Sequence, residues 1–142
     1  MSRVTLLRAN RAGRASVVRR ARAARRADGQ IRQLVDAYLS SGSEDWSEGG
    51  VATRVEDLAT GDPDRFWQFL ELLLENQLGL NDLVALGRPL TSLLRYHPDL
   101  MTDGLASAAR QSRQMRDALT AVDSDRVAPD VWKKVSSAIF AD

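Results

Sequence analysis

The sequence predicts an all-α fold, a single helical bundle or αα-hairpin array of about six to seven short antiparallel helices. Apolar residues recur at three- and four-residue spacing along most of the chain after residue 30. No segment shows the strict alternation of polar and apolar residues that marks a strand. Proline-containing boundaries at Pro63, Pro98 and Pro129 divide the pattern into helices joined by short turns.

The composition restricts the chemistry of the protein. The chain has 142 residues, enough for one domain with a real core. It has no cysteine and one histidine, which excludes disulfides and the usual nitrogen and sulfur ligand set of zinc. Its apolar runs fall far short of the roughly 20 residues that span a bilayer. We therefore expect a cytoplasmic protein without a membrane span or a bound cofactor.

The charge is unevenly distributed along the chain. Residues 1–32 hold ten arginines and one acid, a net charge of +9. Residues 33–142 hold ten basic and eighteen acidic residues, a net charge of −8. This contrast predicts a basic extension over residues 1–28, rich in arginine and alanine, and an acidic helical domain over residues 29–142.

The basic extension has three interpretations. It binds nucleic acid by neutralising phosphates, it is an arginine-rich targeting peptide, or it is an incidental extension that partly folds back onto the acidic domain. No aromatic residue is interleaved with the arginines, so there is no platform for base stacking. The candidate nucleic-acid contacts are Arg8, Arg11, Arg14, Arg19, Arg20, Arg22, Arg25 and Arg26.

The first helices of the domain follow from their apolar stripes. A stripe with helical spacing runs from Ile31 to Leu39, and Ser40 to Gly42 ends that helix. The next helix is expected from Val51 to Ala59, with Trp46 packed at its entrance.

The stretch from Asp62 to His97 is the most apolar part of the chain and predicts two antiparallel helices. Asp62 caps the first helix and Pro63 occupies its first position. Gly79 supplies a positive φ in the turn, and Asn81 caps the second helix. Gly87-Arg88-Pro89 then interrupts that helix, because proline removes an internal hydrogen bond. The expected apolar faces are Phe66, Phe69, Leu70, Leu73 and Leu74 in the first helix and Leu83, Leu86, Leu90, Leu93 and Leu94 in the second.

Three further helices complete the prediction. One carries Leu100, Met101 and Leu105, and a second carries Met115, Leu119 and Val122. The last begins at Pro129 and buries Val131, Trp132, Val135 and Ile139 or Phe140.

Three motifs resemble those of a family of small bacterial helical domains of unknown function. The family shows a helix that begins near DPERAW, a G-P-L-x-x-L-L-x-x-H-G hallmark and a late tryptophan helix. Here the hallmark corresponds to Gly87, Pro89, Leu90, Leu93, Leu94 and His97, and the late helix to Pro129, Asp130, Val131, Trp132 and Val135. Arg88 is inserted before Pro89, and Pro98 replaces the usual glycine. The resemblance covers roughly residues 30–141 and implies an all-helical fold, without implying an activity.

The candidate binding residues are few. His97 is the single imidazole, and a base or a binding contact competes with a simpler role at a helix C-terminus. Arg88 and Arg95 present charge near the Gly87-Arg88-Pro89 break, which is either a binding notch or a packing kink. Glu71 and Glu75 lie four residues apart on the predicted wet face, where solvated surface is the simpler interpretation than an acid pair.

The residue inventory disfavours an enzyme. Asp123, Asp125 and Asp130 lack the glycine and the terminal glutamate of a calcium loop, and no phosphate-binding loop is present. The leading hypothesis is therefore a non-catalytic protein-interaction module. One version is an immunity-like protein that offers Glu71, Glu75 and Asp82 to a basic partner. The alternative is nucleic-acid association through the basic extension.

Overall fold

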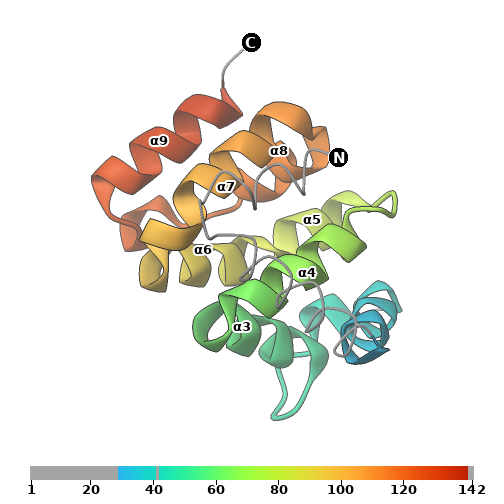
Figure 1. The fold of residues 1–142 in the computed structure, drawn as a ribbon. Helices are drawn as coiled ribbons and strands as arrows, with labels where there is room; N and C mark the ends of the chain where they lie inside the picture. Colours follow the sequence, from blue (N-terminus) through green and yellow to red (C-terminus); the bar gives the residue numbers. More distant parts are fainter. Residues whose placement is uncertain (1–28, 41, 141–142) are drawn as a thin grey trace, which may run out of the picture.

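The computed structural model describes residues 29–40 and 42–140, and every regular element within them is a helix (Figure 1). The predicted all-α class is confirmed. The basic extension, residues 1–28, lies outside the described residues. The elements are a helix over residues 29–39, the 3₁₀ helix η1 (Gly42–Glu44), α3 (Val51–Gly61), α4 (Pro63–Leu73), α5 (Leu80–Ala85), α6 (Gly87–Tyr96), α7 (Pro98–Gln111), α8 (Arg113–Leu119), the 3₁₀ helix η2 (Ser124–Arg126) and α9 (Pro129–Ile139).

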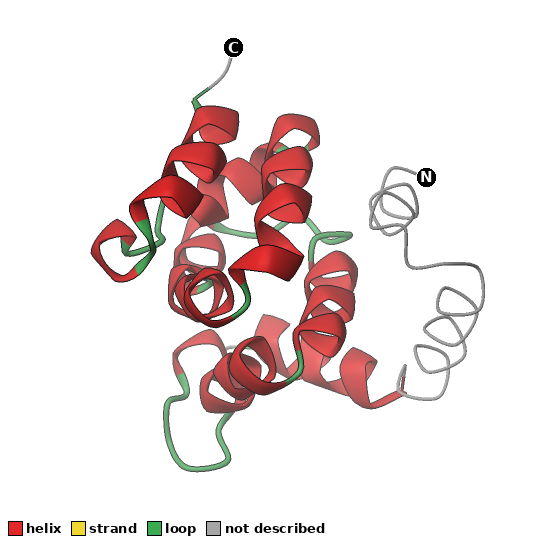
Figure 2. Cartoon of the chain, turned by 60° about the vertical axis from the view of Figure 1, so that its left-hand side comes forward, coloured by secondary structure: helices red, strands yellow, loops and turns green. Residues whose placement is uncertain are grey.

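The helix α6 lies at the centre of the fold. It contacts α3, α5, α7, α8 and η2. Figure 1 and Figure 2 show α7, α8 and α9 grouped above it and α3 and α4 below it. The helix over 29–39 packs across α4, where the Tyr38 and Phe69 rings meet edge to face with centroids 5.7 Å apart. One continuous core joins the two groups.

The core consists of the predicted apolar faces. Phe66, Phe69 and Leu73 of α4 are completely buried, and Trp67 is nearly so. The leucines of α6 in the hallmark motif, Leu90, Leu93 and Leu94, are equally inaccessible. Four apolar side chains that were predicted to face or border the core are instead exposed at element ends and in a loop: Leu39, Trp46, Leu100 and Phe140.

The helix starts follow the expected rules only in part. The Asp62 carboxylate accepts a hydrogen bond from the backbone N–H of Arg65, and Pro63 follows at the first position of α4. The prediction for α5 is wrong, because Gly79 rather than Asn81 precedes that helix. Gly79 has φ −73°, so it does not supply a positive φ. Gly49, in the loop before α3, has φ 75°.

The expected hairpin between the two helices of the 62–97 stretch is also revised. The most extensive packing of α6 is against α3, and α4 also packs against α3. The turn after α4 and the short α5 redirect the chain, so α6 returns beside α3. The break at Gly87 therefore positions the central helix.

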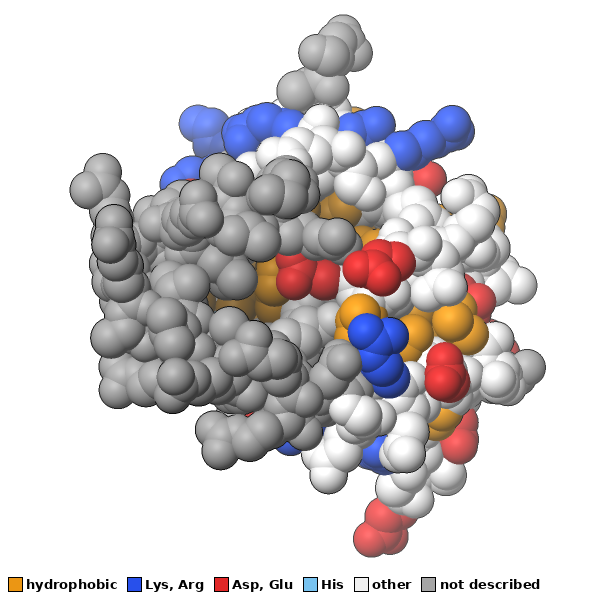
Figure 3. Space-filling view, turned by 45° about the vertical axis from the view of Figure 1, so that its right-hand side comes forward, with side chains coloured by type: hydrophobic (Ala, Val, Ile, Leu, Met, Phe, Trp, Pro, Cys, Tyr) orange, Lys and Arg blue, Asp and Glu red, His pale blue; other side chains and the backbone are white. Residues whose placement is uncertain are grey.

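The surface of the described residues is mixed in charge. Figure 3 shows Lys and Arg side chains along the upper edge of one face, with Asp and Glu side chains across its middle and lower part. Within the parts of the chain that the structure describes, no helix is both long and apolar enough to cross a membrane.

Candidate functional site

The central helix α6 exposes a single line of side chains. Gly87, Pro89, Leu90, Thr91, Leu93 and Leu94 are buried. Arg88, Arg95 and Tyr96 are exposed, and Ser92 is half-buried. Arg88, Ser92 and Arg95 are four and three residues apart, so they lie on one face over about 10 Å. We call Arg88, Ser92, Arg95 and Tyr96, together with the Trp46 ring stacked on Arg88, the α6 strip.

The inner side of the Gly87-Arg88-Pro89 break packs closely against the rest of the domain. The helix α5 ends at Ala85, and α6 restarts at Gly87. A Cβ atom at Gly87 would run into the backbone and side chain of Ala121. Only glycine lets the start of α6 approach the chain after α8 so closely. The predicted restart of the helix is confirmed, and its tight packing explains the glycine.

Thr91 ties the restarted helix to the loop before η2. Its hydroxyl donates to the carbonyl of Gly87 over 2.6 Å and accepts from the backbone N–H of Asp123 over 3.0 Å. Thr91 is buried, so its bond to Gly87 is shielded from water, while its bond to Asp123 is partly buried. Hydrogen-bonding groups on the inner side of the break therefore find partners within the chain itself.

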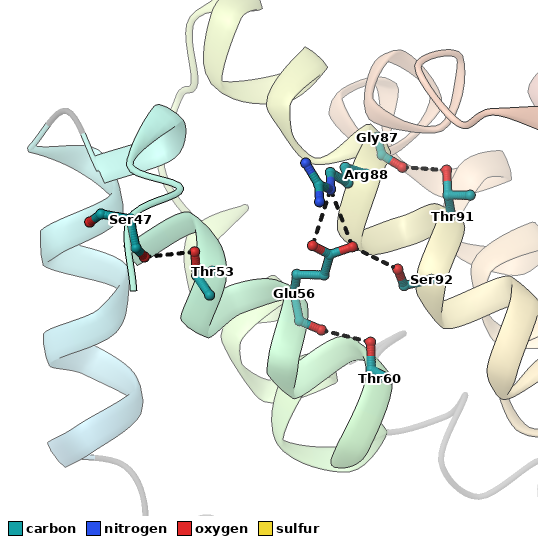
Figure 4. Close-up of polar contacts among 8 residues, drawn as sticks. All are labelled: Ser47, Thr53, Glu56, Thr60, Gly87, Arg88, Thr91 and Ser92. Carbon is teal, nitrogen blue, oxygen red and sulfur yellow. Dashed lines mark hydrogen bonds and ion pairs between the residues drawn. The ribbon is translucent and has the colours of Figure 1, made fainter. Parts of the chain in front are cut away.

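Arg88 points outward from the break and has two partners, Glu56, which Figure 4 shows, and Trp46. Its Nε lies 3.1 Å from Oε1 of Glu56, on α3, and its guanidinium carbon lies 4.2 Å from the centre of the Trp46 ring. The Ser92 hydroxyl donates to the other Glu56 oxygen over 3.1 Å. Glu56 thus holds two members of the strip in place. About 61% of the Arg88 side chain is still exposed, so it remains accessible to a partner.

The loop that carries Trp46 is held by local hydrogen bonds. The Asp45 carboxylate accepts from both the backbone N–H and the hydroxyl of Ser47, and these bonds lower the pKa of Asp45. The carbonyl of Asp45 accepts from the N–H of Ala52, and that of Ser47 from the hydroxyl of Thr53. The loop therefore fixes the approach of Trp46 to α6.

Arg95 repeats the arrangement at the other end of the strip. Its guanidinium carbon lies 5.2 Å from the centre of the Tyr96 ring, and both side chains are exposed. Arginine held against an aromatic ring keeps its charge while it loses part of its conformational freedom. The strip therefore has an arginine–aromatic pair at each end.

His97 fastens the end of α6 to α3. It follows the last residue of α6, and its Nε2 lies 2.6 Å from the carbonyl oxygen of Thr60. A carbonyl only accepts, so Nε2 carries the proton in this bond. Within the described ranges no hydrogen bond joins His97 to Ser92, which bonds Glu56 instead. This geometry favours the anchoring role for His97.

The predicted acidic candidates lie elsewhere. Glu71 is on α4, and Glu75 is in the turn that follows it. Neither belongs to the elements that form the α6 strip. Glu75 is exposed as expected, but Glu71 is half-buried and its Oε2 is withdrawn from solvent. Asp82, on α5, accepts a hydrogen bond from Ser43 over 2.9 Å. The structure does not bring these acids together with Arg88, Arg95 and His97.

The aspartates after α8 have structural roles. Asp123 caps η2 through the N–H of Asp125, and Asp130 lies in the first turn of α9. In residues 29–40 and 42–140, no group of three or more histidine, aspartate or glutamate side chains is arranged to hold a metal ion.

The chain matches no protein-family model, no curated protein and no solved structure with which it was compared. The resemblance to the helical-domain family stays a hypothesis.

Sequence reasoning found part of the strip. It named Arg88 and Arg95, but it placed Trp46 at a helix entrance and did not single out Glu56 or Tyr96. Glu56 and Trp46 lie more than thirty residues before Arg88, so no local pattern joins them to it. The available signal was Tyr96, which falls outside the apolar stripe of its own helix.

Proposed function

We propose that this protein is a non-catalytic, cytoplasmic protein-interaction module that binds a partner through the α6 strip. The carrying observation is that the most buried helix of the fold exposes one line of residues, with Arg88 on Trp46 at one end and Arg95 on Tyr96 at the other. Tryptophan, tyrosine and arginine are the residues that dominate protein–protein binding energies.

The surroundings of the strip support this use. Trp46 and Tyr96 are 38% and 53% exposed, and Leu100 in the first turn of α7 adds a side chain that is 49% exposed. Large apolar side chains beside held cations provide both desolvation energy and orientation for a partner. The strip therefore suits a partner surface that combines apolar and acidic groups.

The experiment compares two charge-matched variants of the full chain as baits in lysate of the source organism. R88A/R95A removes the charges of the strip, while R110A/R113A removes two exposed arginines at the α7–α8 corner. We expect a partner retained by the wild type and by R110A/R113A, with affinity for R88A/R95A at least about tenfold weaker. Equal retention by both variants, or no partner at all, contradicts the proposal.

The acidic version of the module is less well supported. In that version Glu71, Glu75 and Asp82 meet a basic partner in an immunity-like complex. The Asp82 carboxylate is engaged by Ser43, and its backbone carbonyl accepts from Tyr38. A partner lost by E71Q/E75Q but kept by R88A/R95A would favour this version.

Nucleic-acid association through residues 1–28 is the second candidate, because ten of the chain's arginines lie in residues 1–32. Binding by this route falls steeply with salt, since each neutralised phosphate releases counterions. A titration of the full chain with duplex DNA at low and high salt tests it. The matched variant replaces all eight candidate arginines by glutamine, and binding that survives this change removes the candidate. They are Arg8, Arg11, Arg14, Arg19, Arg20, Arg22, Arg25 and Arg26.

A further inference from the structure

Two large apolar side chains are exposed on α5, directly before the α6 strip. Leu80 and Val84 are 68% and 50% exposed, and they lie four residues apart on one face of the helix. Leu83, on the inner side of α5, is buried. Two neighbouring aliphatic side chains exposed to this extent leave apolar surface in water, so this face of α5 is a candidate for contact with another molecule.

The apolar face of α5 continues into the α6 strip. Leu86, the residue between the two helices, has a right-handed helical conformation with φ −69° and ψ −15°. Its N–H donates to the carbonyl of Leu83, and its own carbonyl accepts from the N–H of Leu90. The chain therefore passes from α5 to α6 within helical conformation, and Val84 comes one turn before Arg88.

The two arginines of the α6 strip are one heptad apart. Arg88 and Arg95 share one face, about 10 Å apart along the helix, and the rings of Trp46 and Tyr96 restrain their guanidinium groups. Residues seven apart on a partner helix have the same spacing and also share one face. Residues on one face of an extended strand are about 7 Å or about 13 Å apart, and neither spacing matches the two arginines. The spacing therefore favours a helical partner.

We propose that the partner of the α6 strip is an acidic amphipathic helix that lies along α5 and α6. Its apolar side covers Leu80 and Val84, and its carboxylates, one heptad apart, meet Arg88 and Arg95. Charge complementarity selects acidic side chains, because both arginines are exposed. Nucleic-acid phosphates would also suit the arginines, but they offer no apolar contact to the two aliphatic side chains. This inference rests on the proposed function, to which it adds the secondary structure and the charge spacing of the partner.

The test measures the binding of two synthetic helical peptides of about 21 residues, or three heptads, to the full chain. The first probe has leucines and one glutamate at fixed positions of every heptad, so its glutamates share one face beside the leucines. The second probe has the same composition, but its glutamates are five residues apart and are distributed around the helix. We expect fluorescence anisotropy to show binding of the first probe to the wild type, and at least about tenfold weaker binding of the second. Equal affinities for the two probes overturn the proposal.

Charge variants locate the contacts of the glutamates. R88A/R95A should bind the first probe at least about tenfold more weakly than the wild type does. R110A/R113A removes the same charge from the α7–α8 corner and should retain the wild-type affinity. The arginines of residues 1–28 are present in both variants, so their attraction for the glutamates is common to both. Equal affinities of the two variants overturn the proposal.

Apolar variants locate the contact with α5. L80S/V84S should bind the first probe at least about fivefold more weakly than the wild type does, because the leucines of the probe lose their apolar contacts. F140S changes a side chain that is 72% exposed just after α9, and it should bind like the wild type. Equal affinities of L80S/V84S and the wild type overturn the proposal. If L80S/V84S is unfolded by circular dichroism, the comparison of the two probes on the wild type still decides.

Other occupants of the surface would give different results. A single-stranded oligonucleotide that displaces the first probe from the wild type, and binds R88A/R95A more weakly, would assign the strip to nucleic acid and overturn the proposal. A wild-type dimer that L80S/V84S converts to a monomer in light scattering would show that a second copy covers α5, which also overturns it.

The failure of this inference is distinguishable from the failure of the proposed function. If neither probe binds, while R88A/R95A still loses its partner from the lysate, the acidic helix is overturned and the α6 strip remains the binding site. If R88A/R95A retains the partner from the lysate, the proposed function itself is contradicted.

Discussion

The guanidinium carbon of Arg88 lies 4.2 Å from the centre of the Trp46 ring, across the junction of α6 and the loop before α3. Glu56 holds the same arginine through its Nε, so a ring and a carboxylate share one cation. Forty-two positions in the chain separate Trp46 from Arg88, and the contact exists because α6 packs against α3.

This contact predicts a measurable energetic coupling. We expect a double-mutant cycle of Trp46→Ala and Arg88→Ala to give a coupling energy of about 0.5–1 kcal/mol in urea unfolding. The cycle isolates the contact between the ring and the guanidinium, because the single Arg88→Ala variant and the double variant both lose the Glu56 contact. The cycle of Arg95 and Tyr96 is the comparison, and it should give a smaller value because that distance is 5.2 Å and both groups are exposed. A Trp46–Arg88 coupling of zero would show that the ring stack has no energetic role.

The same glycine-to-alanine substitution is expected to have opposite effects on stability at Gly87 and at Gly104. Gly87→Ala places a Cβ atom against the Ala121 backbone, and we expect it to lower the free energy of unfolding by about 1–3 kcal/mol. Gly104→Ala, inside α7, places its Cβ at an ordinary 3.6 Å from the Trp67 ring, and we expect a gain of about 1 kcal/mol from helix propensity. Urea denaturation of the two variants measures both. A Gly87→Ala protein as stable as the wild type would mean that the start of α6 is free to move.

Much of the fold is readable from the sequence because it depends on local rules. The helical spacing of Phe66, Phe69 and Leu73 selects the buried side of α4 whatever lies opposite. Capping by Asp62 involves only residues of the same turn. The incorrect predictions concern turns and helix ends, where more than one backbone conformation suits the sequence. Gly79 adopts a negative φ, and Phe140 falls just beyond the last turn of α9.

The candidate site was harder to predict because it is assembled between elements. The partner of α6 is α3, and the sequence suggested α4 since α4 is the preceding long helix. With that pairing, Glu56 and Trp46 had no visible relation to Arg88. The break at Gly87 was recognisable as a break, but its cause, the close approach of Ala121, is a long-range contact that no local signal contains.

Phe66 and Phe140 test how much stability the core provides. Phe66 is completely buried in α4, and Phe66→Ala should cost about 3–5 kcal/mol, much of the stability of a small domain. Phe140, just after α9, is 72% exposed, and the same substitution there should change stability by less than about 0.5 kcal/mol. Chemical denaturation of both variants gives the comparison. A small effect at Phe66 would show that the packing of α4 is not as described.

Stability should fall in alkaline solution because of Tyr38. Its side chain is 2% exposed, and its hydroxyl donates to the carbonyl of Asp82 over 2.8 Å. Burial, with a smaller contribution from the Asp82 carboxylate, raises the pKa of Tyr38 in the folded protein. In the unfolded chain a tyrosine ionises near pH 10.

The direction of the pH effect on stability follows from the protonation of Tyr38 in the folded and in the unfolded protein. Below about pH 10 Tyr38 is neutral in both, and above it only the unfolded chain loses the proton, which favours unfolding by up to about 1.4 kcal/mol per pH unit. We expect the free energy of unfolding, measured in urea between pH 8 and about pH 11, to decline over the upper part of that range. Tyr38→Phe should be less stable at pH 8, since it loses the bond to Asp82, but should decline less steeply. Equal slopes in the wild type and in Tyr38→Phe would refute the assignment to Tyr38.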